Sequence, residues 1–172
     1  MSDDLLGKVQ GAQNKVEKLA SRIPGYRGYK RKEQRREADK LLRLEVARRY
    51  EEQLRRLGEV QYRLSEKGEL TLLASLERAA SKLQLLIDRL RTAAYGYAGL
   101  FDALKVDEDV LDRLYDFDYA MLEGVEDLAA SLDALDRAVK EDEKVSAQTE
   151  KLFDRLTALN DTFTRRQDVI LE

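Results

Sequence analysis

Apolar residues recur alternately three and four positions apart along most of this 172-residue sequence. That spacing places them on one face of a helix, and the seam between packed helices repeats every 3.5 residues, as in a coiled coil. One proline and nine glycines leave few points at which such helices would break. We therefore expect an all-α protein that is long enough to bury a core within one domain.

Breaks between the apolar stripes predict the order of the helices. We expect an N-terminal amphipathic helix over residues 1–23 and a Pro/Gly turn over residues 24–29. A four-helix bundle is expected over residues 30–172, with helices at about 30–67, 69–105, 107–141 and 143–171. Because the connections are short, consecutive helices should run antiparallel. The predicted fold is an elongated antiparallel up-down four-helix bundle with an additional short N-terminal helix.

The helix expected over residues 69–105 has the most regular stripe. The stripe runs from Leu76 to Leu104 without a polar exception and passes Gly96 and Gly99. We expect one continuous helix, although each glycine costs about 1 kcal/mol relative to alanine. A kink at the glycines is the alternative.

Two charged residues interrupt otherwise apolar stripes of the last two helices. Asp118 and Arg166 are equally far along the chain from the turn expected near Asp142, so a hairpin brings them to the same level. An unpaired buried charge is costly, and we hypothesise an ion pair in the core that sets the register of the helices. In the alternative, both side chains reach solvent.

Basic residues and tyrosines alternate around the Pro/Gly turn and the start of the next helix. Cations beside aromatic rings can hold the phosphates of a lipid surface or a nucleic acid. The alternative is an ordinary charged helix surface, because acidic residues follow within one helical turn. The anion- or partner-binding candidates are Arg22, Tyr26, Arg27, Tyr29, Lys30, Arg31, Lys32, Arg35 and Arg36.

A second candidate site is an aromatic cluster around the connection between the second and third bundle helices. Aromatic residues at helical spacing usually fill a core. Off-stripe aromatics are better placed for a partner, and the two neighbouring glycines leave room for close approach. The aromatic patch candidates are Tyr95, Phe117 and Tyr119.

The composition argues against several kinds of chemistry. The chain has no Cys, His or Trp, so thiolate and imidazole metal sites and His-dependent triads are absent. Asp116 and Asp118 offer only a fragment of a calcium loop. We expect no catalytic residue, no metal site and no cofactor, and thus no enzyme.

The function expected is that of a non-catalytic helical-bundle interaction or scaffold protein, with self-association as one form of it. The alternative is peripheral binding to an anionic membrane through residues 1–23 and the adjacent basic turn. Residues 1–21 balance three cations against three anions, which weakens that alternative. Nucleic-acid binding is a third, less favoured hypothesis. With no secretory signal or membrane-spanning stretch recognised, the expected location is cytoplasmic.

Charge is distributed unevenly along the chain, although the formal net charge is only −3. Residues 22–63 carry a net charge of +7, whereas residues 101–143 carry −11. If the helices containing these segments lie side by side, the charges neutralise each other within the protein. If they lie apart, the protein presents one basic and one acidic face, which favours head-to-tail association or an anionic partner.

Overall fold

The computed structural model describes residues 2–31, 34–93 and 108–171. Within these ranges the secondary structure is helical, without strands. The helices are α1 (Ser2–Arg22), α2 (Arg35–Glu66), α3 (Leu70–Thr92), α6 (Glu108–Glu141) and α7 (Val145–Leu171). The predicted all-α helical bundle is confirmed.

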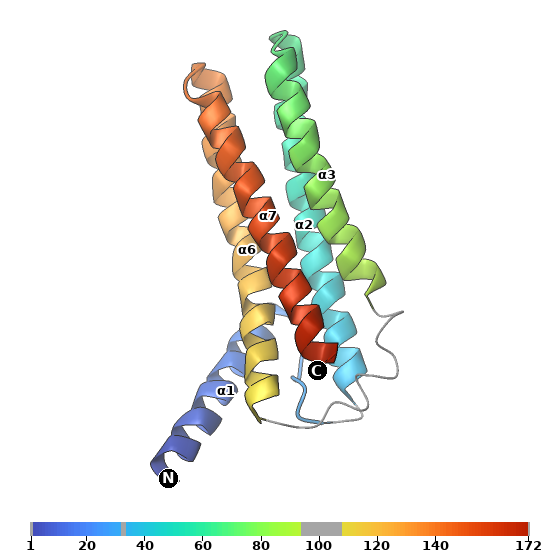
Figure 1. Cartoon of the computed structure of the whole chain (residues 1–172), viewed down its shortest axis with the longest axis vertical. Helices are drawn as coiled ribbons and strands as arrows, with labels where there is room; N and C mark the ends of the chain where they lie inside the picture. The colour runs from blue at the N-terminus through green and yellow to red at the C-terminus, as the bar shows by residue number, and fades with distance from the viewer. Residues whose placement is uncertain (1, 32–33, 94–107, 172) are drawn as a thin grey trace.

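The bundle consists of two antiparallel hairpins, α2–α3 and α6–α7 (Figure 1). Helix α2 also packs along α6, and α3 packs along α7, so that the order around the bundle is α2, α3, α7, α6. Helices α3 and α6, which follow each other in the described chain, therefore occupy diagonal corners. The neighbours α2 and α6 run in the same direction, as do α3 and α7.

Both hairpin turns lie where the sequence predicted them. Gly68 closes the α2–α3 turn with a φ of 75°, a conformation that glycine adopts without strain. Asp142 and Lys144 take left-handed conformations in the α6–α7 turn, and α7 begins at Val145, two residues after the expected start at residue 143. The Glu143 N–H donates to the Ala138 carbonyl, which ends α6 with a hydrogen-bonded turn.

Two helix boundaries differ from the prediction. Helix α3 ends at Thr92 with Ala93 as its C-cap, not at about residue 105, and residues 94–107 lie outside the described residues. Two glycines follow closely in the sequence and lower the helical propensity at this point. Helix α2 begins at Arg35 rather than near residue 30, because side chains of the bundle bind the backbone of Tyr29 in a non-helical linker.

The predicted stripes form the core. Leu83, Leu114, Leu135 and Leu156 from three of the helices are fully buried, together with Phe163. No helix in the described part of the chain is long and apolar enough to cross a membrane.

Helix α1 is not one of the four helices of the bundle and contacts it only in part. It packs against α6, and Leu19 and Ile23 near its C-terminal end are fully buried. Figure 1 shows the N-terminal half of α1 extending past the end of the bundle. The N-terminal segment is therefore an arm that is attached at one end only.

Candidate functional site

Asp118 and Arg166 form an ion pair in the core of the bundle. Arg166 Nε donates to Asp118 Oδ1 over 2.6 Å, and the two side chains are 1% and 0% exposed. The predicted contact is present, and α6 and α7 are in the register that the equal sequence distances implied. Whether the pair sets that register stays a prediction.

The linker before α2 extends this pair into a network. The Tyr29 hydroxyl donates to Asp118 Oδ2 over 2.5 Å and accepts a hydrogen bond from Arg166 over 3.1 Å. The Tyr29 N–H donates to the Tyr115 hydroxyl over 2.8 Å, and the Tyr29 carbonyl accepts from Arg35 Nε. The Tyr29 ring also stacks on Tyr115, with ring centroids 5.4 Å apart. One residue of the linker is thus bonded to α2, α6 and α7.

Two further residues of α2, Asp39 and Arg43, complete the network. Arg166 donates to Asp39 Oδ1 over 2.7 Å, and Asp39 Oδ2 accepts from Arg43 over the same distance. Arg43 also donates to the Leu90 carbonyl near the end of α3. The network therefore joins all four bundle helices and the linker.

Burial and charge act against each other in this network. Burial raises the pKa of Asp118, although Arg166 and Tyr29 act to lower it. Burial would lower the pKa of Arg166, but Asp118, Tyr29 and Asp39 hold it well above its ordinary value. Burial also raises the pKa of Tyr29, so its hydroxyl stays protonated and can donate to Asp118. Each charge is costly to bury, and the protein offsets that cost only while every partner is present.

The basic-turn candidates do not form one binding surface. Their members divide into a buried and an exposed group. Tyr26, Tyr29 and Arg35 are buried in the core, where their side chains cannot contact a membrane or stack on a base.

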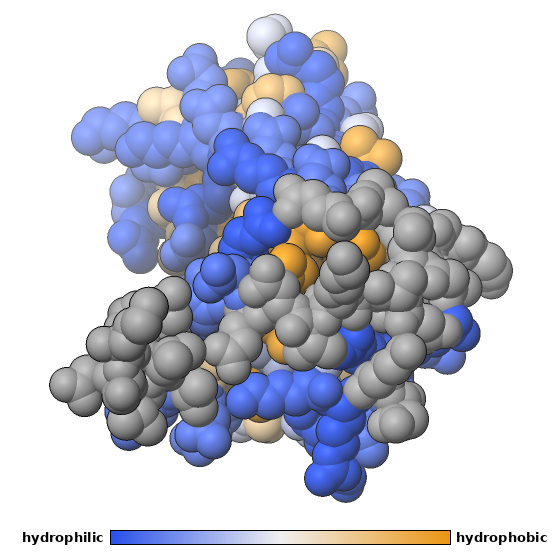
Figure 2. Space-filling model, turned by 60° about the horizontal axis from the view of Figure 1, so that its bottom comes forward, coloured by the Kyte–Doolittle hydropathy of each residue, from blue (hydrophilic) through white to orange (hydrophobic). Residues whose placement is uncertain are grey.

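The exposed members of the candidate set are cations. Arg27, Lys30, Arg31 and Arg36 are exposed, while Lys32 lies outside the described residues. Figure 2 shows that hydrophilic side chains dominate the described surface at this end of the molecule, with apolar ones visible near its centre. The exposed linker cations remain candidates for an anionic partner, but without the interleaved aromatic rings.

The remaining candidate, Arg22, attaches α1 to α6. It donates to Glu123 over 2.7 Å and lies 3.4 Å from Glu126. Lys15, about two helical turns before it, binds Asp112 and Asp116 over 2.9 and 2.7 Å. These pairs lie along one side of α6 and hold the C-terminal half of α1 against it.

Basic α2 and acidic α6 neutralise each other along their shared edge. Ion pairs join Arg56 to Asp133 and Arg63 to Asp136. Lys67 binds Asp142 at the hairpin tips. The oppositely charged segments therefore lie side by side, and much of the sequence dipole is internal.

The aromatic patch is only partly accessible. Phe117 is half-buried and packs against the core, so only part of its ring is accessible, and its role as a contact stays a prediction. Tyr119 is half-buried, with the Arg22 guanidinium 5.5 Å and the Lys18 ammonium 5.8 Å from its ring centroid. Tyr95 lies outside the described residues.

Sequence reasoning missed two features that fix the packing. Asp39 belongs to the acidic residues that the alternative placed on a charged helix surface, and Arg43 was not singled out, yet both are buried. Their spacing of four was visible, but charged pairs at that spacing are common on helix surfaces. Gly124 was also missed: a Cβ there would overlap a Leu159 methyl carbon and lie 2.7 Å from the Tyr50 hydroxyl.

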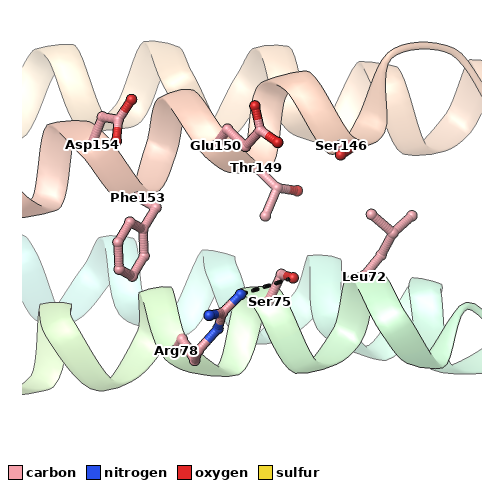
Figure 3. A pocket seen from close by; sticks show the side chains of 8 residues that line it. All are labelled: Leu72, Ser75, Arg78, Ser146, Thr149, Glu150, Phe153 and Asp154. Carbon is pink, nitrogen blue, oxygen red and sulfur yellow. Dashed lines mark hydrogen bonds between the residues drawn. The ribbon is translucent and has the colours of Figure 1, made fainter.

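A groove lies between α3 and α7 near the hairpin turns (Figure 3). Its volume is about 180 Å³. Leu72 and Phe153 contribute apolar surface, and Ser75 and Thr149 face each other across it. Thr149, like Arg166, is a polar residue at a buried position of α7, and its small side chain leaves space there.

No group of three or more acidic residues with the geometry of a metal site occurs in the described ranges. Comparison with models of protein families, with curated proteins and with solved structures found no match to this chain. Inferences about function therefore depend on the chain's own geometry.

Proposed function

We propose that the protein is a non-catalytic helical interaction protein that binds through the N-terminal half of α1. The observation that carries this proposal is the position of α1, whose N-terminal half extends past the bundle (Figure 1). Leu5, Val9 and Ala12 continue, at helical spacing, the stripe of the buried Leu19 and Ile23. Such an amphipathic helix can lay its apolar face into a groove of another protein.

The attachment of α1 supports this role. Lys15 and Arg22 are paired with acidic residues of α6, and the linker that follows α1 is bonded into the core at Tyr29. The arm is therefore mounted in a defined direction. Pre-organisation of this kind lowers the entropic cost of binding.

Substitution on the apolar face of α1 tests the proposal. Leu5→Glu and Val9→Glu should lower the affinity of the protein for a second copy or for a crosslinked partner by about tenfold or more. Each substitution introduces a charge into an apolar contact. Gln10→Glu and Gln13→Glu are matched controls, because both side chains are exposed on the same helix. Sedimentation velocity and crosslinking in lysate provide the readouts. A monomeric wild type with no crosslinked partner would refute the proposal, as would equal effects of the two sets of variants.

Binding to an anionic membrane is the second candidate. Exposed Arg27, Lys30 and Arg31 lie in the linker, which is near the same end of the bundle as the arm. Cations beside an amphipathic helix favour anionic lipid, and salt screens their attraction. Co-sedimentation with anionic vesicles should then fall with salt and fall again in Leu5→Glu. Equal recovery with neutral vesicles would exclude this alternative.

A further inference from the structure

Cations of α1 lie along a matching row of carboxylates on α6. Lys15, Lys18 and Arg22 are three and four residues apart, so they project from one side of α1. The carboxylates that bind Lys15 and Arg22 recur at helical spacing along α6; they are Asp112, Asp116, Glu123 and Glu126. The two helices therefore run in the same direction along a row of ion pairs.

Tyr119 lies in the middle of this acidic row. The Arg22 guanidinium is 5.5 Å and the Lys18 ammonium 5.8 Å from the centroid of its ring, within the reach of about 6 Å that cation–π contacts show. Arg22 also binds Glu123 over 2.7 Å. An aromatic face beside carboxylates thus forms a site for guanidinium and ammonium groups, and α1 fills it.

Helix α1 neutralises these carboxylates only in part. In the described contact, three cations of α1 face four carboxylates of α6. The side chains of Asp116 and Glu126 remain 61% and 65% exposed. Helix α6 as a whole carries eleven acidic residues and three basic ones. A helix with more cations would therefore be held on this face more strongly than α1.

The attachment of α1 is weaker than the packing of the bundle. Its ion pairs are half-exposed, and such pairs contribute little to stability and are screened by salt. Leu19 and Ile23 supply the fully buried apolar contact. The linker that follows is held independently, because Tyr29 is bonded to Tyr115 and Asp118. Detachment of α1 would therefore leave the core network in place.

We propose that this face of α6 is a docking surface for a basic amphipathic helix of a partner protein, and that the C-terminal half of α1 is its intramolecular competitor. The partner's apolar residues take the place of Leu19 and Ile23, and its Lys and Arg side chains that of Lys15 and Arg22. A second copy of α1 brings only the same cations without the advantage of the tether, so it does not displace the chain's own helix. The inference goes beyond the proposed function, which concerns the N-terminal half of α1.

Charge reversal tests whether the ion pairs hold α1. The chain has no cysteine, so cysteines introduced at Gln13 and Ala130, both exposed, carry two spin labels whose separation reports the position of α1. The wild type should give one narrow distance distribution. Lys15→Glu combined with Arg22→Glu should broaden it, because like charges then face each other.

Two further variants make this result specific. Asp116→Lys with Glu123→Lys, added to the charge-reversed chain, should restore much of the narrow distribution, because opposite charges again face each other. Arg56→Glu is the control, since it reverses a similarly half-exposed pair between α2 and α6 and should leave the distribution unchanged. Circular dichroism confirms that each variant is folded.

A cationic peptide tests the docking surface on the full chain. The probe is a fluorescent peptide of residues 10–24 that carries Asn14→Arg and Ser21→Arg, two positions that border the cationic side of the helix. By fluorescence anisotropy it should bind the chain with Lys15→Glu and Arg22→Glu about tenfold more tightly than the wild type, whose own α1 competes from within the same molecule. Salt should weaken this binding. The peptide of unmodified sequence should bind more weakly, because it neutralises fewer carboxylates.

Three results would overturn the inference. An unchanged distance distribution in the charge-reversed chain would show that the ion pairs do not hold α1. Equal affinity of the peptide for the two chains, or no binding at millimolar peptide, would show that α1 does not cover a docking surface. Equal binding of the unmodified peptide would identify the occupant as α1 of a second copy and not a more basic helix. The proposed function is tested on Leu5 and Val9, so either proposal can fail alone.

Discussion

Removal of one member of the buried ion pair should cost the protein much of its stability. Asp118→Ala leaves Arg166 Nε and the Tyr29 hydroxyl without their acceptor at a site that is 0 to 1% exposed. Breaking a buried ion pair in this way costs about 3–5 kcal/mol. Arg166 keeps Asp39 as a partner, so we expect a value near the lower end. The free energy of unfolding of a typical domain is about 5–15 kcal/mol in total.

Replacing both partners should be far less harmful than replacing one. Asp118→Leu combined with Arg166→Met removes both charges and leaves Asp39 paired with Arg43. The remaining loss is the acceptor of the Tyr29 hydroxyl, a cost of about 1–3 kcal/mol. In a cycle of Asp118→Leu, Arg166→Met and the double variant, the double variant should therefore cost less than the two single variants together, by about 3 kcal/mol or more.

Urea unfolding followed by circular dichroism measures these free energies. Asp133→Ala is the control, because Asp133 is largely exposed and its pairing with Arg56 lies on the surface; its cost should stay below about 1 kcal/mol. A cost below about 1 kcal/mol for Asp118→Ala, or additivity of the single variants, would refute the reasoning. If the double variant is stable but its NMR spectrum loses dispersion, the pair also sets the register, as hypothesised.

Two further predictions follow from packing and from pH. Gly124→Ala should destabilise the protein by about 1–3 kcal/mol in urea unfolding, because the added Cβ overlaps side chains of neighbouring helices. Gly58→Ala is the control: its Cβ meets open space, so the substitution should stabilise the protein by about 0.5–1 kcal/mol. Similar effects of the two substitutions would contradict the close packing at Gly124. A hydrogen bond from Arg22 holds the pKa of Glu123 below its ordinary value of 4.5. The pairing therefore stabilises the attachment of α1 above that pH and is lost as the pH falls through the lowered pKa. A spin label at Gln13 should gain mobility in that range, and an unchanged acid transition in Glu123→Gln would contradict the assignment.

The basic turn is the segment in which the structure differs most from the binding site expected from the sequence. Tyr29 and Arg35 were candidates for an accessible binding site, because nothing local in the sequence distinguishes a buried polar residue from an exposed one. The partners of Tyr29 are distant in the sequence, since Tyr115 and Asp118 are on α6. In contrast, the pair of Asp118 and Arg166 could be predicted, because both residues interrupt an apolar stripe and a hairpin relates their positions.

The charge pattern gave two possibilities that the sequence could not separate. Residues 22–63 and 101–143 were known to be oppositely charged, but their arrangement depended on which helices were neighbours. The diagonal placement of α3 and α6 makes α2 and α6 adjacent, and pairs such as Arg63 with Asp136 result. The orientation of α1 was also undetermined, because an amphipathic stripe requires a partner but does not specify one.

The sequence by itself determined the helical class, the two hairpin turns and the stripes that form the core, since helical periodicity and turn residues act over a few positions. It did not determine the order of helices around the bundle, the depth of the polar network or the opening between α3 and α7. These depend on contacts between residues far apart in the chain, where small differences in side-chain size and charge select one packing among several. Tertiary structure therefore decided that Tyr29 and Arg35 are buried in the network that joins the linker to the bundle, and that the arm and the groove lie at opposite ends.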